Sequence, residues 1–350
     1  MQHRGFASDF RSDTVTLPSR AMRSAMAAAE VGDDSLDGDP TVRRLEAAAA
    51  EWVGKEGALF VPSGTMANQV ALGAWTRPGQ EILAERRAHV LRYEAGAPAV
   101  LHGLLTTALD GDGGALDPAA VRAAIRSGSE HEPRTALVCV EQTHMASGGR
   151  VLPLANLQAV QAVARAAGAR VHMDGARLAN AVVASGVPAA RWGAACDSVA
   201  VCLSKGLGAP FGSFVAGERA FLARARLVRQ RLGGGLRQAG VVAAAALLAL
   251  RENVARLADD HALARELAAR LARIEGLRPP PVEEVETNIV NVAVEHPGWT
   301  PDELAAALAS KGVGVMSLPP GILRFVTHLG LGSADLGRLE RALRDLLAAG

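Results

Sequence analysis

A short apolar segment that ends in lysine and glycine constrains this chain more than any other stretch. Residues 199–203 read Val-Ala-Val-Cys-Leu, Lys205 and Gly206 follow one residue later, and further glycines stand at 208 and 212. A continuous apolar run of this length is typical of a buried strand in a parallel sheet. Glycines after such a strand let the backbone turn and approach a ligand. We therefore expect Lys205 at the sheet edge where open α/β proteins bind ligands.

Lysine is scarce in this chain, which makes Lys205 easy to single out. Only Lys55, Lys205 and Lys311 occur among 37 basic residues. Arginine cannot form a Schiff base, because its pKa is too high for the neutral group to exist, whereas a desolvated lysine can. An average loop lysine is a solvated surface residue. The strand and the glycines around Lys205 instead favour a nucleophilic amine.

A second strand-like segment, residues 169–173, ends in Asp174 and Gly175. Asp174 precedes Lys205 by 31 residues, which is enough for the helix and connection of one βαβ unit. Two adjacent parallel strands would bring this carboxylate and the amine to the same edge. Pyridoxal phosphate needs such a pair, an imine-forming lysine and a carboxylate that keeps the pyridine nitrogen protonated.

Three motifs carry a resemblance to a known family. They are Asp-Gly-Ala-Arg at 174–177, Ser-Lys-Gly-Leu-Gly-Ala-Pro at 204–210 and Gly-Gly-Gly-Leu-Arg-Gln-Ala-Gly at 233–240. In this order they closely resemble the low-specificity L-threonine aldolases, pyridoxal-phosphate enzymes of the aspartate-aminotransferase fold in the beta-eliminating lyase superfamily. The resemblance extends from Arg11-Ser12-Asp13 to residues 324–328, nearly the whole chain.

The resemblance and the order of segments predict an α/β fold. We expect a large domain with a mostly parallel sheet flanked by helices (aspartate-aminotransferase-like, PLP fold type I) and a small α+β C-terminal domain. A chain of 350 residues is long for one hydrophobic core. The expected limits are an N-terminal arm over 1–18, the large cofactor-binding domain over 19–245 and the small domain over 246–350. A long Ala/Leu helix should begin near residue 241 and continue to about 271.

Composition excludes several classes of partner. A formal net charge of +1 gives no reason to expect nucleic acid or an anionic membrane surface. The first ten residues lack the apolar core of a signal peptide, and no run approaches 18 apolar residues. Cys139, Cys196 and Cys202 are an odd number, and two of them lie in strand-like runs. Reduced, buried thiols of a cytoplasmic protein fit better than disulfides.

The cofactor phosphate is expected at a turn between a strand and a helix within residues 58–69. Backbone N–H groups at a helix start bind anions, so we assign the phosphate to Gly64 and Thr65. A plain N-cap by Ser63 or Thr65 would give the same pattern. A lone histidine at a helix start, such as His89, is usually structural. The resemblance implies that His89 stacks on the pyridine ring.

The resemblance also implies how the substrate carboxylate is held. Ser12, which could be only a turn residue, corresponds to a serine that helps bind this group in the family. Arg324 lies among apolar residues, where an unpaired cation is costly, so it should meet an anion. By resemblance that anion is the substrate carboxylate, shared with Arg177. Arg237 should reach the phosphate of a neighbouring subunit in a homotetramer built from dimers.

A histidine after the strand at 135–140 completes the predicted site. His144 precedes two glycines and is our first candidate for the base that takes the β-hydroxyl proton, directly or through a water, with His89 second. We expect no catalytic metal, because no cysteine or carboxylate cluster joins His172 and Asp174. The predicted catalytic residues are Lys205, His89, His144 and Asp174; the cofactor-binding residues are Lys205, Gly64, Thr65, His89, Asp174, Arg177 and Arg237; the substrate-binding residues are Ser12, Arg177, Arg324 and His144.

The reaction implied by the resemblance is reversible, pyridoxal-phosphate-dependent cleavage of L-threonine, L-allo-threonine and related β-hydroxy-α-amino acids to glycine and an aldehyde. Two alternatives stay open. One is a β-eliminating lyase of the same fold that acts on aromatic amino acids or cysteine. The other is a protein that binds pyridoxal phosphate without catalysis, which the complete set of site residues argues against.

One loop departs from the family pattern. Family members commonly read Val-Gly-Asp-Asp-x-Tyr-Gly-x-Asp-Pro-Thr where residues 31–41 of this chain have Leu36, Asp37 and Gly38 in the middle. The loop thus loses an aromatic face and a phenolic donor. If it lies beside the β-substituent of the substrate, we expect bulky substituents, such as the phenyl of phenylserine, to be handled relatively better than the methyl of threonine.

Overall fold

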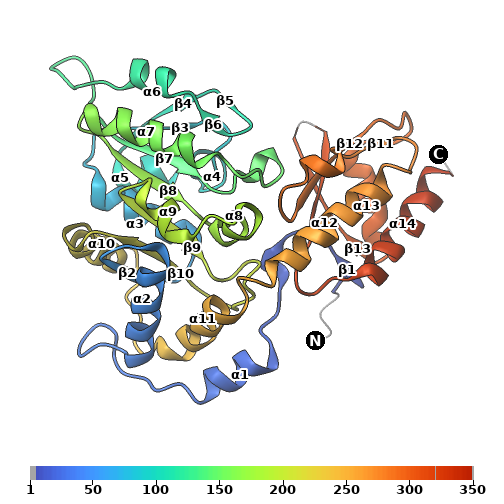
Figure 1. Ribbon diagram of the computed structural model, residues 1–350, viewed down its shortest axis with the longest axis horizontal. Helices are drawn as coiled ribbons and strands as arrows, with labels where there is room; N and C mark the ends of the chain where they lie inside the picture. The colour runs from blue at the N-terminus through green and yellow to red at the C-terminus, as the bar shows by residue number, and fades with distance from the viewer. Residues whose placement is uncertain (1–4, 320, 349–350) are drawn as a thin grey trace.

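The structure, a computed structural model, describes residues 5–319 and 321–348 and has a large and a small unit (Figure 1). Among these residues, a seven-stranded sheet forms the centre of the large unit, and within it only β10 runs against its neighbours. In spatial order its strands are β2 (Gly57–Val61), β10 (Ser213–Gly217), β9 (Ser198–Cys202), β8 (Arg170–Asp174), β7 (Thr135–Glu141), β3 (Glu81–Glu85) and β4 (Leu105–Leu109). This mostly parallel sheet confirms the predicted α/β class.

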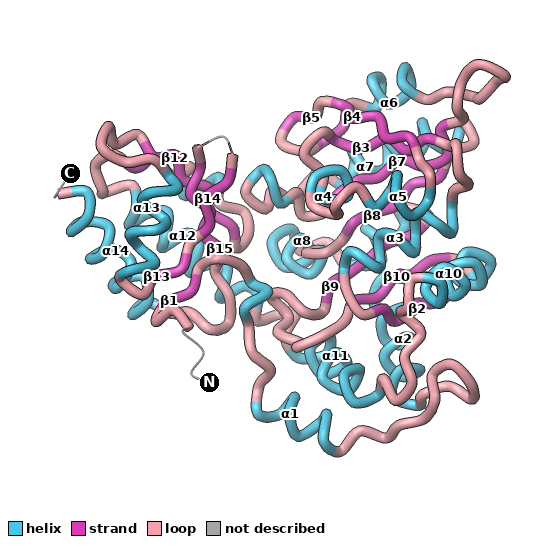
Figure 2. Tube along the Cα trace, turned by 180° about the vertical axis from the view of Figure 1, so that it is seen from behind, coloured by secondary structure: helices cyan, strands magenta, loops and turns pink. Residues whose placement is uncertain are grey.

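Helices cover both faces of the large sheet (Figure 2). On β10, Phe214 and Ala216 join the core under one layer of helices, and Val215 joins the core under the other, as the alternation of side chains along a strand requires. Burial on both faces explains why β7 and β9, in the middle of the sheet, are largely apolar. The first layer holds α2 (Pro40–Val53), α7 (Leu154–Ala166), α8 (Leu178–Ser185), α9 (Ala189–Ala194) and α11 (Gly240–Glu252), and the second holds α3 (Gly64–Trp75) and α10 (Arg219–Arg231).

The small unit is an antiparallel sheet covered by helices, and the N-terminal arm packs with it. β1 (Ser8–Asp9) pairs in parallel with β13 (Val313–Gly314). The ring of Phe10 meets that of Phe325 edge-on, with 6.2 Å between centroids. This α+β unit agrees with the predicted fold class, whereas the limits 1–18, 19–245 and 246–350 stay predictions. The sheet order is β11 (Leu277–Arg278), β12 (Ile289–Val294), β15 (Ile322–Val326) and β14 (Met316–Leu318), with α12 (Leu257–Leu271), α13 (Pro301–Ser310) and α14 (Ser333–Leu347) packed on it.

The long helix expected from about 241 to 271 is wrong, because the chain breaks it into α11 and α12. The side chain of Asn253, at the end of α11, donates a hydrogen bond to the carbonyl of Leu207 at 2.7 Å. Arg256 Nη2 donates to the carbonyl of Gly206 at 3.0 Å. The hydrogen bonds at the break therefore connect the junction of the two units to the loop that follows Lys205.

The remaining elements are shorter. They are α1 (Arg20–Ala27), α4 (His89–Arg92), α5 (Ala97–His102), α6 (Pro118–Ala124), β5 (Gly111–Asp112), β6 (Ala115–Leu116), η1 (Asp13–Val15), η2 (Met145–Ser147) and η3 (Val282–Glu284).

No helix in the described part of the chain is long and apolar enough to cross a membrane.

The loop before α2 is held by one fully buried carboxylate, that of Asp39. Its Oδ1 accepts from the backbone N–H groups of Thr41 and Val42 at 2.9 and 3.0 Å, which caps α2. Its Oδ2 accepts from Gly32 at 3.2 Å and from Gly240, the first residue of α11, at 2.8 Å. One side chain thus fixes two helix starts and the loop between residues 31 and 39.

We expect Asp39→Ala to lower the free energy of unfolding by about 3 kcal/mol, because buried backbone N–H groups lose their acceptor. The matched control is Asp117→Ala, which removes an exposed cap that serves only Ala119 of α6 and should cost at most about 1 kcal/mol. Urea denaturation followed by circular dichroism measures both. Equal losses in the two variants would contradict the bridging role of Asp39.

Candidate active site

The carboxyl ends of β8 and β9 form one edge of the large sheet, and the two key side chains lie there. The strands pair in parallel, with Asp174 opposite Ala200. Asp174 is the last residue of β8 and is buried, and Lys205 follows three residues after β9 and is half-buried. The predicted βαβ arrangement of these two strands is therefore confirmed.

The carboxyl group of Asp174 is held in its ionised form. Burial alone would raise its pKa, but the charges of His89 and Lys205 and a hydrogen bond from Asn68 Nδ2 at 2.8 Å hold the pKa below its ordinary value. The backbone N–H of Ala176 also donates to Asp174 Oδ1, at 3.1 Å. A negative group is thus fixed at the sheet edge next to the lysine.

His89, at the start of α4, lies against this carboxylate and against a second one that the sequence analysis missed. Its Nδ1 is 2.9 Å from Glu94 Oε1 and 4.0 Å from Asp174 Oδ2. Burial lowers the pKa of His89, but Glu94 and Asp174 raise it by more, so the pKa lies above its ordinary value. Its backbone N–H donates to Glu141 Oε2 at 2.7 Å. The backbone and one ring nitrogen of His89 are therefore both fixed by carboxylates, while its stacking on a pyridine stays a prediction.

Asn68 connects the two carboxylates and is another residue that sequence reasoning missed. It lies on α3, one turn after Gly64, and its Nδ2 donates to Asp174 Oδ2 at 2.8 Å and to Glu94 Oε1 at 2.7 Å. Its Oδ1 is 3.1 Å from His172 Nε2. Both amide protons and the carbonyl oxygen are engaged, so the amide has one allowed orientation. A buried asparagine inside an apolar helix was the only signal in the sequence.

His172 continues this network to the far end of α3. Its Nδ1 is 2.9 Å from Ser198 Oγ, which also accepts from Trp75 Nε1 at 2.9 Å. The amide nitrogen of Asn68 already donates to two carboxylates, so its Oδ1 accepts the Nε2 proton of His172. Nδ1, which carries no proton in the neutral ring, then accepts from the Ser198 hydroxyl. This tautomer is neutral, and burial accordingly lowers the pKa of His172 to about 4, although Asp174 opposes the shift.

The N-terminus of α3 offers the anion site expected at Gly64 and Thr65. The helix begins at Gly64, and Ser63 Oγ accepts from the N–H of Met66 at 3.2 Å. A Cβ at Gly64 would collide with Cys202 Sγ, so glycine lets the turn pass close to β9. Ser213 Oγ, buried beside this turn, has no hydrogen-bond partner among the described residues. The turn can therefore cradle a phosphate, with a hydroxyl left to bind it.

Arg177 is already paired. At the start of α8, its Nε and Nη2 donate to the two oxygens of Asp13 at 2.8 and 2.7 Å. Asn288 Nδ2 lies 3.3 Å from the same carboxylate. Burial raises the pKa of Asp13, but Arg177 and then Lys205 lower it by more, to about 2. Asp13 was quoted in a motif but given no role, because its partner lies 164 residues away.

Arg324 is a buried cation without an acid partner in the described part of the chain. It lies on β15 and is 6 % exposed. Its Nη1 contacts Met145 Sδ at 3.3 Å. Its Nη2 contacts Met316 Sδ at 2.9 Å and the carbonyl of Arg11 at 3.1 Å. Its Nε has no hydrogen-bond partner among the described residues. Burial and the nearby Arg177 lower its pKa to about 10. The guanidinium remains charged at neutral pH and lacks an anion.

Three other predicted residues make contacts of their own. Ser12 Oγ caps η1, where it accepts from the N–H of Thr14 at 3.2 Å. His144 is fully buried, and both its ring nitrogens are engaged, Nδ1 with Ser147 Oγ at 2.9 Å and Nε2 with Glu85 Oε2 at 3.1 Å. Arg237 has 64 % of its side chain exposed, and its Nη1 lies 3.6 Å from Asp33. Their assigned roles stay predictions.

Comparisons with known proteins agree with this geometry. Residues 9–295 match the family model described as beta-eliminating lyase. The chain is 46 % identical to a probable low-specificity L-threonine aldolase 2 of Arabidopsis thaliana, over 94 % of both chains. It is 41 % identical to the low specificity L-threonine aldolase of Escherichia coli, over 97 % of this chain and 99 % of that one. The chain belongs to the beta-eliminating lyase family, among its low-specificity L-threonine aldolases.

Solved structures agree on the fold of this aldolase family member. A threonine aldolase of Leishmania major has a TM-score of 0.81 at 20 % identity and covers 97 % of this chain and 99 % of its own. A serine palmitoyltransferase of Sphingomonas wittichii has a TM-score of 0.75 at 18 % identity, with 98 % and 86 % covered. Together with the mostly parallel sheet, they confirm the predicted fold type.

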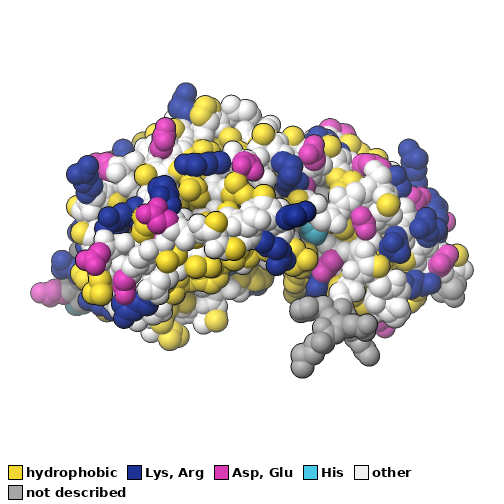
Figure 3. Space-filling view, turned by 90° about the horizontal axis from the view of Figure 1, so that it is seen from below, with side chains coloured by type: hydrophobic (Ala, Val, Ile, Leu, Met, Phe, Trp, Pro, Cys, Tyr) yellow, Lys and Arg dark blue, Asp and Glu magenta, His cyan; other side chains and the backbone are white. Residues whose placement is uncertain are grey.

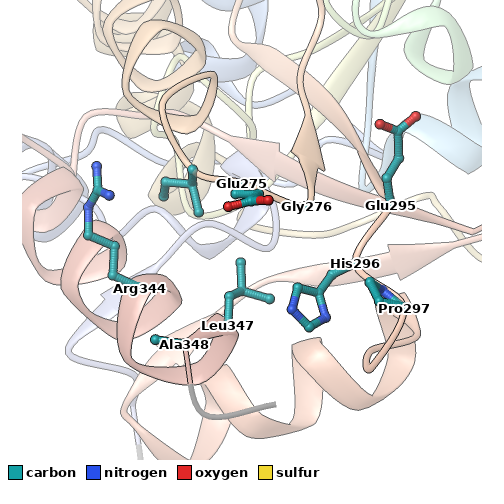
Figure 4. A pocket seen from close by; sticks show the side chains of 9 residues that line it. Glu275, Gly276, Glu295, His296, Pro297, Arg344, Leu347 and Ala348 are labelled. Carbon is teal, nitrogen blue, oxygen red and sulfur yellow. The ribbon is translucent and has the colours of Figure 1, made fainter.

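This aldolase family member has a separate pocket and one cluster of possible metal ligands. A pocket of the small unit lies between α14 and the turns around Gly276 and His296, and it contains none of the predicted residues (Figure 4). Possible metal ligands of His89, Glu94 and Asp174 lie within 4.8 Å of one another. The oxygens of Glu94, however, already accept from the amides of Asn68 and Gln69. The absence of a catalytic metal stays a prediction.

The low pKa of His172 predicts how stability changes with pH. The unfolded chain binds a proton on this ring near pH 6.5, whereas the folded chain binds it only near pH 4. Stability is therefore lost as pH falls through this window, by about 2 kcal/mol between pH 7.5 and 5 from His172 alone. His172→Gln should unfold with a shallower pH dependence in urea than wild type, and the exposed His131→Gln should not. Parallel curves for wild type and His172→Gln would contradict the neutral, buried ring.

Proposed function

We propose that this chain cleaves L-threonine, L-allo-threonine and related β-hydroxy-α-amino acids to glycine and an aldehyde, reversibly and with pyridoxal phosphate. The observation that carries the proposal is Arg324. A guanidinium that is 6 % exposed, with an unpartnered Nε and no acid beside it in the described residues, needs an anionic ligand. It contacts Met145, which follows β7 at the same sheet edge as Asp174. An amino acid carboxylate satisfies it there.

The residues at the sheet edge fit pyridoxal phosphate. When bound, this cofactor withdraws electrons from the bond at the substrate Cα that breaks. Lys205 is the amine that would hold it covalently, and Asp174 is the carboxylate that would keep its ring nitrogen protonated. The first N–H groups of α3, at Gly64 and Thr65, would bind its phosphate together with the free hydroxyl of Ser213.

The substrate is oriented by charge. Arg324 would bind its carboxylate, and Arg177, which gives Nε and Nη2 to Asp13, would offer the same carboxylate its remaining Nη1. Binding of the carboxylate by the arginines disfavours its loss as carbon dioxide and orients the Cα–Cβ bond for cleavage. Ser12, beside Asp13 at the start of η1, is placed to help.

Two histidines are candidates for the general base that takes the proton of the β-hydroxyl group. Both ring nitrogens of His144 are engaged, as described above. The side chain of His89 is 24 % exposed, and its Nδ1 is committed to Glu94. In the described part of the chain its Nε2 makes no hydrogen bond, so this nitrogen is free to accept a proton. The geometry thus favours His89 as the base and His144 as a positioning residue, which reverses their predicted order.

Product analysis tests the proposed function. Threonine should yield glycine and acetaldehyde, and the β-elimination alternative would instead yield 2-oxobutanoate and ammonia. Lys205→Ala should lack both this activity and the visible absorbance of a lysine-bound cofactor. Lys55→Ala is the control, because Lys55 Nζ donates to the carbonyl of Cys196, 2.7 Å away, and the variant should keep both properties. Borohydride attachment of cofactor to Lys55 or Lys311 in the Lys205→Ala protein would contradict the assignment.

We further infer a tetramer built from dimers, with Arg237 completing the phosphate site of a neighbouring subunit. Exposed apolar side chains support association. Leu17, Val31, Leu36 and Val241 have between 42 % and 77 % of their surface exposed, and Figure 3 shows hydrophobic side chains gathered on one face of the molecule. The loop that holds Leu36 packs on the loop of Arg237, because the backbone N–H of Asp34 donates to the carbonyl of Arg237 at 3.0 Å.

The three buried free cysteines support a cytoplasmic location.

Subunit mixing tests the shared site. Hybrids of Arg237→Ala and Lys205→Ala chains should regain up to roughly a quarter of wild-type activity, because half of randomly formed dimers are hybrids with one complete site. Hybrids of Lys205→Ala and Asp174→Asn should regain none, because these two side chains belong to the same site of one chain. Activity that never exceeds that of the separate variants in verified hybrids would contradict sharing.

A further inference from the structure

The guanidinium of Arg324 is held by sulfur. On the antiparallel sheet of the small unit, Arg324 stands directly opposite Met316 on one side and Asn291 on the other. Directly opposite residues share a face, so the three side chains form one row. Met316 Sδ lies 2.9 Å from Nη2, and Met145 Sδ, from the large unit, lies 3.3 Å from Nη1.

This arrangement positions the cation without neutralising it. A thioether is a weak hydrogen-bond acceptor that carries no charge, so it cannot compete with an incoming carboxylate. A carboxylate of the protein in the same place would pair with the arginine permanently, as Asp13 pairs with Arg177. Sulfur therefore keeps Arg324 aligned and available.

The two methionines differ in their exposure. Met316 is 36 % exposed, on an edge strand, whereas Met145 is 8 % exposed in a small cluster with Ile289 and Val326. Oxidation of methionine depends on access of the oxidant to the sulfur, as for other surface thioethers. A peroxide can reach Met316 more readily than Met145.

We propose that Met316 is a peroxide-sensitive modification site that controls whether Arg324 can bind its carboxylate; this rests on the proposed function of Arg324. A peroxide transfers one oxygen atom to Sδ. The O–O bond breaks, an S–O bond forms, the sulfide loses two electrons, and hydrogen peroxide leaves as water. The product is methionine sulfoxide.

Oxidation changes what Arg324 contacts. The sulfoxide oxygen is a strong, partly negative acceptor, and it forms at a sulfur that already touches Nη2. It binds the guanidinium in place of the substrate carboxylate. Because the carboxylate is held before and during the reaction, its loss raises KM more than it lowers kcat.

The experiment treats the holoenzyme with dilute hydrogen peroxide and follows threonine cleavage and peptide mass together. Addition of one oxygen to the Met316 peptide should coincide with a rise in KM of about tenfold to hundredfold. Methionine sulfoxide reductases of both stereospecificities should reverse both changes. Met316→Gln, whose amide oxygen imitates the sulfoxide, should show a raised KM without peroxide.

Variants separate Met316 from other oxidisable groups, with each variant compared with its own untreated sample. Met316→Leu should resist the peroxide-induced rise in KM while keeping all three cysteines and the other methionines. Met26→Leu, which removes a half-buried methionine of α1, should stay as sensitive as wild type. An unchanged KM in enzyme oxidised at Met316, or equal sensitivity of Met316→Leu and wild type, overturns the proposal. If untreated enzyme does not cleave threonine, the proposed function fails instead.

Discussion

The carboxylate of Asp13 is where three distant parts of the chain meet. It lies at the end of the N-terminal arm, accepts two hydrogen bonds from Arg177 of the large unit and contacts the amide of Asn288 in the small unit. Both charged partners are buried. Such a pair adds little net stability, because desolvation offsets the attraction, but removing one partner costs about 3–5 kcal/mol. Its main effect is to fix how arm, sheet and small unit fit together.

That fit decides the charge balance of the site. Asp13 is paired with Arg177. Among the described residues, the second arginine, Arg324 of the small unit, therefore has no acid within ion-pair distance and contacts only two thioether sulfurs and one carbonyl. Asp174 and Glu94 lie beside His89, and the charge of Lys205 acts on both Asp13 and Asp174. The site therefore has a cation at one end and carboxylates at the other. In the proposed function, the substrate carboxylate would meet the cation, and the protonated pyridine of the cofactor would meet the carboxylates.

The sequence allowed the strand ends to be predicted but not the contacts between distant side chains. Lys205 could be placed because a continuous apolar run, typical of a buried strand, stops just before it, and Asp174 because a short strand-like segment ends there before a glycine. Glu94 and Asn68 could not, because their partners depend on how α3 and α4 pack on the sheet. The break between α11 and α12 was missed for a related reason. Local propensity favours one helix there, and the bonds from Asn253 and Arg256 to the loop after Lys205 are tertiary.

Helix α3 shows how such contacts determine chemistry. Its last residue, Trp75, donates to Ser198 on β9, Ser198 to His172 on β8, and His172 back to Asn68 in the middle of the helix. This closed ring permits one tautomer and one amide orientation, so the helix cannot rotate on the sheet without leaving buried groups unpaired. The same rigid helix presents N–H groups at Gly64 and an amide proton to Asp174. The turn at Gly64 and Asp174, the proposed phosphate site and the proposed partner of the ring nitrogen, are thus fixed relative to each other by one hydrogen-bonded body. Arg324, the proposed carboxylate-binding residue, is instead held by flexible thioethers, which would let it adjust to a substrate.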